Sequence, residues 1–264
     1  MLPEIAICGH ANAGKSTLIN ALAGITPRVG PASISERAGW TEKLGFYQLG
    51  FKPPLLTLVD CPGYGFAVGT RQTKKDWISL IEGYLSTRDV LSGCYVVVDV
   101  TRGLCGEDVQ FVNRYLTSLI KQRDMVQKYG VDIHNPAPIN ILLTKCDLIS
   151  DSTLLGNACC AVENDMKELI LKHQSQISSN QGQEDQEKNE NNNPSPFFSV
   201  HPVSAFNGLG IKEIWREMMK IGSHMSYPTS NPREVKHHVL YSPKRQKLEK
   251  KFSSSKTNKQ TPVM

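Results

Sequence analysis

The stretch GHANAGKST, Gly9 to Thr17, follows the apolar run Ile5–Cys8 directly and leads into the helical pattern STLINALAG. It matches the spacing G-x-x-x-x-G-K-[ST], in which glycines allow backbone N–H groups to close around phosphates. With a strand before it and a helix after it, the stretch predicts a phosphate-binding loop at a helix N-terminus rather than a chance glycine-rich turn. We expect Lys15 to bridge the outer phosphates and Ser16 to offer its hydroxyl to Mg²⁺.

Around this loop, short apolar runs alternate with longer helical patterns, which is typical of α/β proteins. The runs predicted as strands are Glu4–Cys8, Lys43–Leu49, Leu55–Asp60, Cys94–Asp99, Ile139–Thr144 and Phe197–Val203. The predicted helices are Lys15–Ala23, Thr73–Ser86, Glu107–Lys128, Ser152–Lys172 and Ile211–Ile221. The pattern predicts a six-stranded, mostly parallel sheet with helices on both faces, and it places Trp77, Leu80, Ile81, Tyr84 and Leu85 on a core-facing helical stripe.

The 264 residues predict one domain with appendages, residues 1–222, followed by a tail, residues 223–264. Within the domain, residues 173–196 are polar and rich in Asn and Gln, so we expect a disordered insertion there. The tail holds nine Lys/Arg and two Asp/Glu, a charge of +7 that leaves −2 for the rest of the chain. Such a tail favours an anionic partner such as nucleic acid, although a solvated tail without a ligand is the alternative.

Hydrophobic residues make up 39% of the chain and no apolar run is long enough to cross a membrane, so we expect a soluble protein. The N-terminal sequence MLPEIAICGH carries no targeting pattern. The seven cysteines show no C-x-x-C spacing, which favours a reduced intracellular compartment and cysteines that act as small hydrophobes over a metal site or disulfides.

The run LLTKCDL, Leu142 to Leu148, predicts which base is bound. A carboxylate at Asp147 can accept the N1–H and N2 donors of guanine, while the stem of Lys145 packs along the ring. Adenine lacks these donors, and a site with unpaired buried polar groups discriminates by a factor on the order of 10⁴. Capping of the next helix is the alternative role of Asp147. After the last predicted strand, the backbone of Ser204-Ala205-Phe206 is placed to meet guanine O6.

The segment DCPGYG, Asp60 to Gly65, follows another apolar run and predicts a switch. At a strand end, Asp60 is suited to hold Mg²⁺ through a water, and the N–H of Gly63 is suited to contact the γ-phosphate and so sense hydrolysis. Thr41 is the upstream residue that we expect to complete the metal shell in the triphosphate state, although a threonine at the start of a strand needs no function.

Taken in order, GHANAGKSTLIN, AGWT, LVDCPGYGFA, WISLIEGYLSTRDVLSG, VVVDVTRGL, LLTKCD and PVSAFNGLGI closely resemble the EngB (YihA) family of GTP-binding proteins. The resemblance spans about Pro3 to Ile221. It implies a P-loop GTPase fold of three layers, binding of GTP/GDP with Mg²⁺, and a role in assembly of the large ribosomal subunit, with eukaryotic relatives in mitochondria or plastids. The implied nucleotide contacts are Gly9, Asn12, Ala13, Gly14, Lys15, Ser16, Thr17, Asp60, Gly63, Thr144, Lys145, Asp147, Ser204, Ala205 and Phe206.

This chain also departs from the family pattern. It has His10-Ala11 where the family usually has Arg-Ser, and Arg-Ala-Gly-Trp-Thr where a Pro-Gly-Arg-Thr type of segment is usual. Bacterial members begin with extra residues and lack so long an Asn-rich insertion, which is consistent with a eukaryotic, organellar member whose N-terminus is incomplete. Tyr64 stands where many small GTPases have the glutamine that orients the attacking water.

From the sequence we therefore expect a monomeric GTPase switch that docks on ribosomal RNA or ribosomal proteins. Lys15, Gly63 and Asn12 are the expected catalytic residues, and Ser16, Thr41 and Asp60 the expected metal ligands. Similar GTPases use the residue type of Asn12 to hold K⁺, so we expect slow hydrolysis that K⁺ or a ribosomal partner accelerates; the alternative is that Asn12 only shapes the loop. A binding module without turnover, and an ATPase or nucleotide kinase, are the rival functions.

Overall fold

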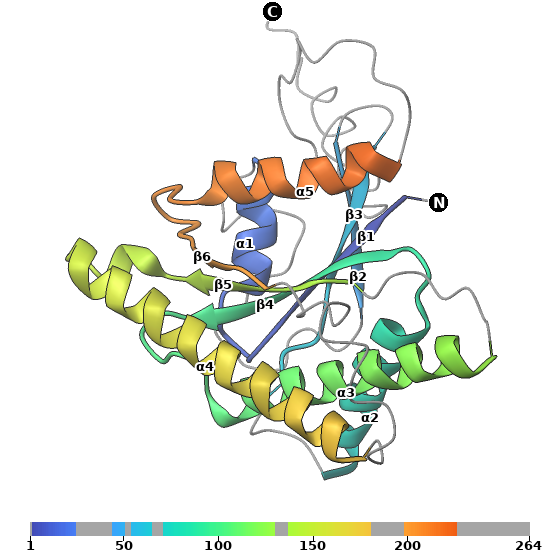
Figure 1. The fold of residues 1–264 in the computed structure, drawn as a ribbon. Coiled ribbons are helices and arrows are strands. Elements are labelled where there is room, and N and C mark those ends of the chain that lie inside the picture. The colour runs from blue at the N-terminus through green and yellow to red at the C-terminus, as the bar shows by residue number, and fades with distance from the viewer. Residues whose placement is uncertain are drawn as a thin grey trace, which may run out of the picture.

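The computed structural model describes residues 2–24, 44–50, 54–64, 71–129, 137–180 and 198–225. Six strands and five α-helices follow one another within these ranges (Figure 1). The strands are β1 (Glu4–Gly9), β2 (Gly45–Leu49), β3 (Leu56–Asp60), β4 (Leu91–Asp99), β5 (Ile139–Thr144) and β6 (Val200–Pro202). The helices are α1 (Lys15–Leu22), α2 (Arg71–Thr87), α3 (Gly106–Tyr129), α4 (Ser152–Asn180) and α5 (Ile211–Met225), with a short 3₁₀-helix η1 (Cys146–Leu148).

The strands form one sheet in the order β2-β3-β1-β4-β5-β6. All neighbouring pairs are parallel except β2 and β3, which are antiparallel. The predicted α/β fold, a six-stranded and mostly parallel sheet between helices, is therefore confirmed. In such a sheet the carboxyl ends of the parallel strands lie at one edge, where the loops after β1, β3, β4, β5 and β6 meet.

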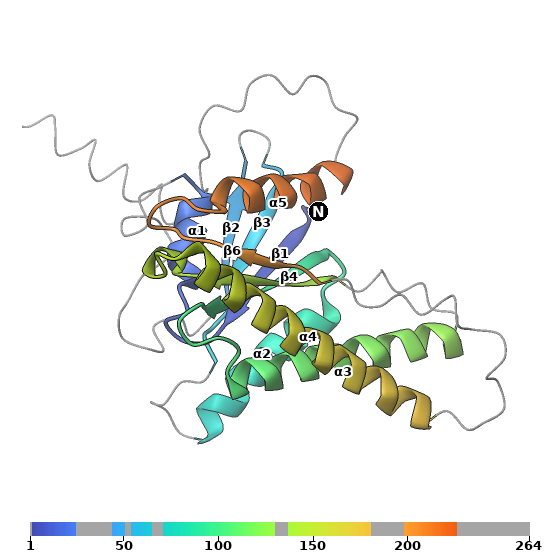
Figure 2. The same cartoon turned by 60° about the vertical axis from the view of Figure 1, so that its left-hand side comes forward.

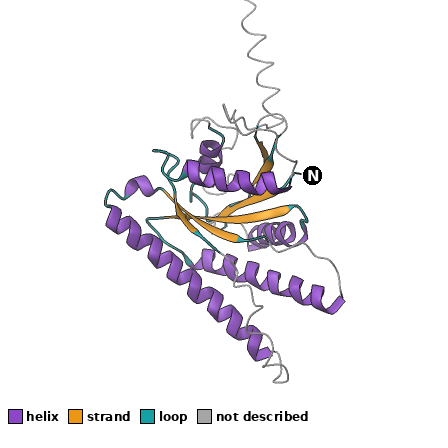
Figure 3. Cartoon of the chain, turned by 45° about the horizontal axis from the view of Figure 1, so that its top comes forward, coloured by secondary structure: helices purple, strands orange, loops and turns teal. Residues whose placement is uncertain are grey.

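Helices cover both faces of the sheet, as Figures 2 and 3 show. Alternate residues of each strand point to opposite faces, so Ile5 and Ile7 of β1 pack with α1 and α5, while Ala6 and Cys8 pack with α2, α3 and α4. The central strand β4 divides in the same way: Tyr95 and Val97 belong to the first core, and the intervening residues belong to the second. Burial of both faces explains why the inner strands β1, β3, β4 and β5 are largely apolar, whereas the edge strands β2 and β6 are only partly buried.

The helices differ in detail from the sequence prediction. Helix α4 continues to Asn180, so the predicted disorder from His173 was wrong for residues 173–180; residues 181–197 lie outside the described part of the chain. The reason is that a helix that is already packed on the sheet can extend through polar residues, because each added residue gains a backbone hydrogen bond once the helix has been nucleated. Helix α5 likewise runs past Gly222 to Met225. None of the helices in the described ranges combines the length and the hydropathy that crossing a bilayer requires.

The predicted stripe on α2 is partly correct. Ile81, Tyr84 and Leu85 are buried in the core, whereas Leu80 is 41% exposed, so its assignment to the core was wrong. Tyr84 also donates its hydroxyl to the Glu4 carboxylate at 2.9 Å, and Arg88 pairs with the same carboxylate at 2.6 Å. These contacts fasten the end of α2 to the start of β1, because a buried carboxylate needs such donors.

Candidate nucleotide-binding site

The loop between β1 and α1 has the geometry of an anion site. Gly14, the N-cap residue of α1, lies in the left-handed region with φ 97°, and no side chain caps the helix. The first N–H groups of a helix have no intrahelical partner, and the helix dipole is positive at this end. An anion such as a phosphate therefore fits the N-terminus of α1.

Lys15 is nearly buried at the centre of this loop. Its ammonium donates hydrogen bonds to the carbonyl oxygens of Gly9 at 3.1 Å and His10 at 3.0 Å. Burial lowers the pKa of Lys15, and the nearby Asp60 carboxylate acts in the opposite direction. The loop thus folds around its own cation and directs that cation toward the space where an anion would sit.

At two positions of the site, neighbouring atoms lie so close to the backbone that only glycine fits. A Cβ on Gly9 would lie 2.4 Å from the carbonyl oxygen of Val97, and one on Gly63 would lie 2.9 Å from both Ala11 Cα and the Lys15 ammonium. Asn12 adopts φ 63°, a left-handed conformation that Asn tolerates better than most residues. Gly63 therefore lies directly against the phosphate loop, and a side chain at this position would displace it.

Ser16 and Asp60 form the oxygen-rich part of the site. The hydroxyl of Ser16 donates to Asp60 Oδ2 at 3.0 Å, while Oδ1 is buried and finds no hydrogen-bond partner among the described residues. Burial raises the pKa of Asp60 to about 6, against the opposing effects of Lys15 and Ser16. An unpaired buried carboxylate oxygen beside a hydroxyl fits Mg²⁺, which prefers oxygen ligands.

The strand β5 ends next to this loop and carries the predicted base contacts. Thr144 donates its hydroxyl to the carbonyl oxygen of Ala13 at 2.6 Å, which ties the phosphate loop to β5. Lys145 follows in the left-handed region with φ 59°, and its ammonium pairs with Asp99 Oδ2 at 2.6 Å. Although burial alone would raise it, the pKa of Asp99 is held low by hydrogen bonds from Lys145 and Thr101.

Asp147 is held by the loop after β6. The hydroxyl of Ser204 donates to Asp147 Oδ1 at 2.5 Å and accepts the N–H groups of Phe206 at 3.1 Å and Asn207 at 3.3 Å. Ser204 itself is fully buried. The alternative role for Asp147, capping the next helix, belongs instead to Asp151, which accepts the N–H of Thr153 at 2.7 Å.

Tyr64 connects the end of the DCPGY segment to the phosphate loop through its backbone. Its carbonyl accepts the N–H of Ala11 at 2.9 Å, and its N–H donates to the carbonyl of Gly9 at 3.3 Å. Its ring stacks on Phe111 of α3 with centroids 5.1 Å apart. The hydroxyl is buried, and burial together with the charge of Asp108 raises the pKa of Tyr64 well above its usual range.

The structure brings most of the predicted site residues to the carboxyl edge of the sheet. Thr41 and Gly65, the last residue of the predicted switch segment, lie outside the described residues. The sequence analysis missed Asp99, although an acidic residue that ends the buried run YVVVD is the pattern that could have found it. The predicted residues that the structure describes at this edge are Gly9, Asn12, Ala13, Gly14, Lys15, Ser16, Thr17, Asp60, Gly63, Thr144, Lys145, Asp147, Ser204, Ala205 and Phe206.

Fold and site together define a P-loop nucleotide-binding protein. The family model described as 50S ribosome-binding GTPase matches residues 4–142. The probable GTP-binding protein EngB of Trichlorobacter lovleyi is 36% identical over 178 residues, which cover 67% of this chain and 79% of that protein. The chain belongs to the EngB family of GTP-binding proteins.

Other relatives are covered less completely. The probable GTP-binding protein EngB of Bacillus velezensis is 35% identical over 148 residues, and the match spans 56% of this chain and 64% of that protein, less than two thirds of its length. A solved structure of a probable GTP-binding protein engB is similar with a TM-score of 0.48 and 20% identity, over 84% of this chain and 99% of that one.

Proposed function

We propose that the chain binds GTP and GDP in preference to ATP and hydrolyses GTP as a molecular switch. The observation that carries this proposal is the fixed carboxylate of Asp147, which Ser204 holds in place at 2.5 Å beside a phosphate loop. A carboxylate held in one orientation can accept the paired N1–H and N2 donors of guanine. Adenine offers an acceptor at N1, so it would leave the carboxylate unpaired.

The first experiment is a base-specificity exchange. Fluorescent GDP is expected to bind, ATP in excess is expected not to compete, and Asp147→Asn is expected to lose guanine nucleotides and gain xanthosine nucleotides. The matched control is Asp165→Asn, an exposed position of α4 that should change neither affinity. If ATP competes with GDP on equal terms, or if Asp147→Asn keeps its preference for guanine, the proposal of guanine specificity is wrong. An ATPase or a nucleotide kinase is then the better hypothesis.

The phosphate end supplies the chemistry of hydrolysis. Lys15 would contact the outer phosphates, and the N–H of Gly63 would sense the γ-phosphate from the position that it occupies against Ala11. Ser16 and Asp60 are the residues that would hold Mg²⁺, together with Thr41 in the triphosphate state. When bound, the ion neutralises charge on the phosphate oxygens.

We propose that turnover is slow and depends on a cation or a partner. Tyr64 replaces the water-orienting glutamine, and it is partly buried against the core, with its hydroxyl buried and its ring stacked on Phe111. Asn12 would then hold K⁺, whose charge can stabilise the transferring phosphoryl group. Single-turnover hydrolysis in K⁺ and in Na⁺, with Asn12→Ala for comparison, tests this.

The same position of Tyr64 favours a second function, a GTP-binding module without turnover. Hydrolysis that K⁺ accelerates in the native chain but not in Asn12→Ala supports the switch. Hydrolysis absent in both salts, and absent also with ribosomes present, supports the module.

We further propose that the partner is the large ribosomal subunit or its RNA, and that the chain acts in an organelle, the mitochondrion first. The description of the matching family, 50S ribosome-binding GTPase, supports the ribosomal partner alone. Binding of the full chain to ribosomal RNA and to large subunits, with GDP and with a non-hydrolysable GTP analogue at two salt concentrations, tests the partner. A chain that ends at Met225 tests the contribution of the basic tail, and imaging of the tagged protein in cells tests the compartment.

A further inference from the structure

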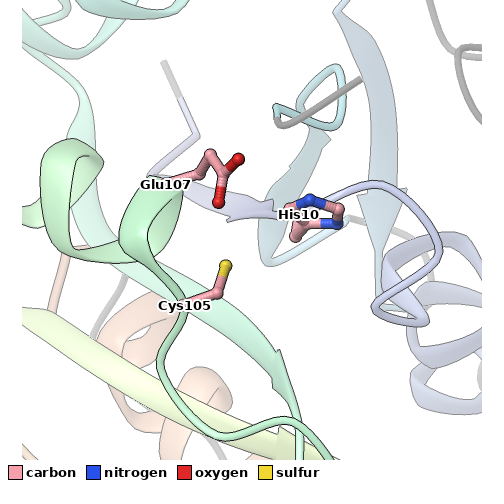
Figure 4. Close-up of side chains that lie close together, drawn as sticks. All are labelled: His10, Cys105 and Glu107. Atoms are coloured by element: carbon pink, nitrogen blue, oxygen red, sulfur yellow. The ribbon is translucent and has the colours of Figure 1, made fainter. Parts of the chain in front are cut away.

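A second group of reactive side chains lies beside the phosphate loop. His10 belongs to this loop, whereas Cys105 and Glu107 lie at the start of α3. One ligand atom from each residue lies within 4.8 Å of the other two, and Figure 4 shows the three side chains around one space. The phosphate and base chemistry described above uses none of these three side chains.

The donor set is that of a transition-metal site. An imidazole nitrogen, a thiolate sulfur and a carboxylate oxygen are the three donor types of protein zinc sites, and three protein ligands leave a fourth position for water. Bond lengths of about 2.0–2.3 Å place the ligands of a tetrahedral site roughly 3.5 Å apart. The observed upper limit of 4.8 Å therefore requires a movement on the order of 1 Å, which the exposed side chain of Glu107 can make.

Asp108 provides an independent observation. It is only 2% exposed, and its Oδ2 accepts the N–H of Cys105 at 3.0 Å and the thiol of Cys105 at 2.9 Å. Its Oδ1 is buried and has no hydrogen-bond partner in the part of the chain that the structure describes. Asp108 therefore fixes both the backbone and the sulfur of Cys105, as a carboxylate that supports a metal ligand does.

Charged groups of both signs surround this space, because the carboxylates of Glu107 and Asp108 are opposed by the Lys15 ammonium and the Arg102 guanidinium. Arg102 opposes a cation, since its guanidinium lies 3.2 Å from His10 Nδ1, but its side chain is exposed and can turn away. The carbonyl of Ala11 lies 2.8 Å from the same nitrogen. Donation of the Nδ1 proton to this carbonyl leaves Nε2 with its lone pair, and metal-binding histidines commonly donate their second nitrogen in this way.

We propose that His10, Cys105 and Glu107 bind a divalent transition metal, and that zinc is the ion whose preferences these donors match. On binding, the S–H bond of Cys105 breaks, its electron pair forms the bond to the metal, and the proton is released to solvent. The ion joins the phosphate loop to the start of α3. Because the His10 carbonyl accepts a hydrogen bond from Lys15 at 3.0 Å, the ion restrains the loop that holds the catalytic lysine.

The site is separate from the magnesium position. Ser16 and Asp60 offer only oxygen, which suits a hard cation, whereas a thiolate selects softer ions. The family that the sequence resembles usually has arginine where this chain has His10, so the site is a property of this chain. Cys105 is only partly buried and is therefore accessible to an ion. Four other cysteines are instead buried as small hydrophobes: Cys8, Cys61, Cys94 and Cys146.

The test is a cobalt titration of the reduced full-length chain in saturating Mg²⁺. One Co²⁺ per chain is expected to produce thiolate-to-cobalt charge-transfer absorption in the near ultraviolet, and one equivalent of Zn²⁺ is expected to remove it. Cys105→Ser should abolish the band, and His10→Ala or Glu107→Gln should weaken cobalt binding by at least about 10-fold. Cys160→Ser and Glu213→Gln, at exposed positions of α4 and α5, are the matched controls and should bind as the native chain does.

Circular dichroism of every variant separates loss of the metal from loss of the fold. A folded Cys105→Ser chain that keeps the band, or a native chain that shows none in excess cobalt, overturns the proposal. Loss of the band in Cys160→Ser also overturns it, because the ion is then bound at the Cys159-Cys160 pair. A zinc-dependent rise in Tm in the native chain that is absent in Cys105→Ser supports the link between loop and helix.

Discussion

The two ends of the nucleotide site differ in how far their polar groups are satisfied without a ligand. At the base end, Asp147 accepts from Ser204 and Lys145 pairs with Asp99. At the phosphate end, Asp60 keeps one buried oxygen without a partner among the described residues, and within the same residues Lys15 donates to the carbonyls of Gly9 and His10 in its own loop. A preformed base end gives specificity at low reorganisation cost, whereas an unsatisfied phosphate end gains free energy when an ion or phosphate arrives.

The largest effect is expected from Lys15→Ala, which removes the cation of the phosphate end. A hydrogen bond to a charged group contributes about 1.5–3 kcal/mol, and about 1.4 kcal/mol is tenfold in affinity. Loss of two such contacts should weaken GDP and GTP binding by at least about 100-fold. Isothermal titration with both nucleotides measures this, with Lys212→Ala, an exposed position of α5, as the control. An affinity within a few-fold of the native value would mean that the loop holds phosphate through its backbone alone.

The second-largest effect is expected in the pH dependence of the stability of the chain, through Asp60 at the phosphate end. Burial raises the pKa of Asp60 from 3.8 to about 6, so the folded chain binds a proton more tightly than the unfolded chain. The contribution of Asp60 to the free energy of unfolding is therefore largest below pH 4. This contribution is lost as the pH rises through 6, and the loss is on the order of 3 kcal/mol. Urea unfolding of the nucleotide-free chain at pH 4 to 7 measures the slope.

Asp60→Asn should flatten this slope, because an amide does not titrate. Mg²⁺ should oppose the loss of stability at pH 7, since it favours the carboxylate. Equal slopes in the native chain and in Asp60→Asn would show that another group is responsible.

At the base end, Ser204→Ala should have a smaller effect. It removes the donor to Asp147 and the acceptor for two backbone N–H groups. Each hydrogen bond contributes about 0.5–1.5 kcal/mol, so guanine nucleotides should bind roughly 10-fold more weakly and the chain should lose about 1–2 kcal/mol of stability. Nucleotide titration and urea unfolding measure the two effects, with the exposed Thr117→Ala as control. If stability falls but affinity does not, Ser204 supports the loop without orienting Asp147.

The same contrast explains what the sequence could predict. The fold followed from local patterns, because strand and helix periodicities and the phosphate-loop spacing are properties of neighbouring residues. The pairs that complete the site join distant residues: Asp99 with Lys145, Ser204 with Asp147, and Cys105 with His10. Their contacts depend on side-chain rotamers and loop conformations, which no local pattern specifies.

Even so, the edge at which these residues meet was predictable. Parallel strands place their carboxyl ends together, so residues that follow β1, β3, β4, β5 and β6 had to converge. Their order in the sheet, and hence which loops would touch, came only with the structure. Local composition was also misleading in one place. It predicted disorder from His173, whereas α4 continues to Asn180 because packing of the preceding turns supports the helix.

The smallest change in nucleotide affinity is expected for substitutions of Phe206. Two such substitutions distinguish the role of its backbone N–H from that of its side chain. The ring is 80% exposed, whereas the N–H donates to Ser204 at 3.1 Å. If this loop meets guanine through its backbone, Phe206→Ala should change GDP affinity by less than about twofold, as ordinary surface substitutions do. Phe206→Pro removes the N–H and should weaken binding several-fold. Equal losses in both variants would mean that the aromatic ring stacks on the base, and the base end would then be less preformed than its hydrogen bonds indicate.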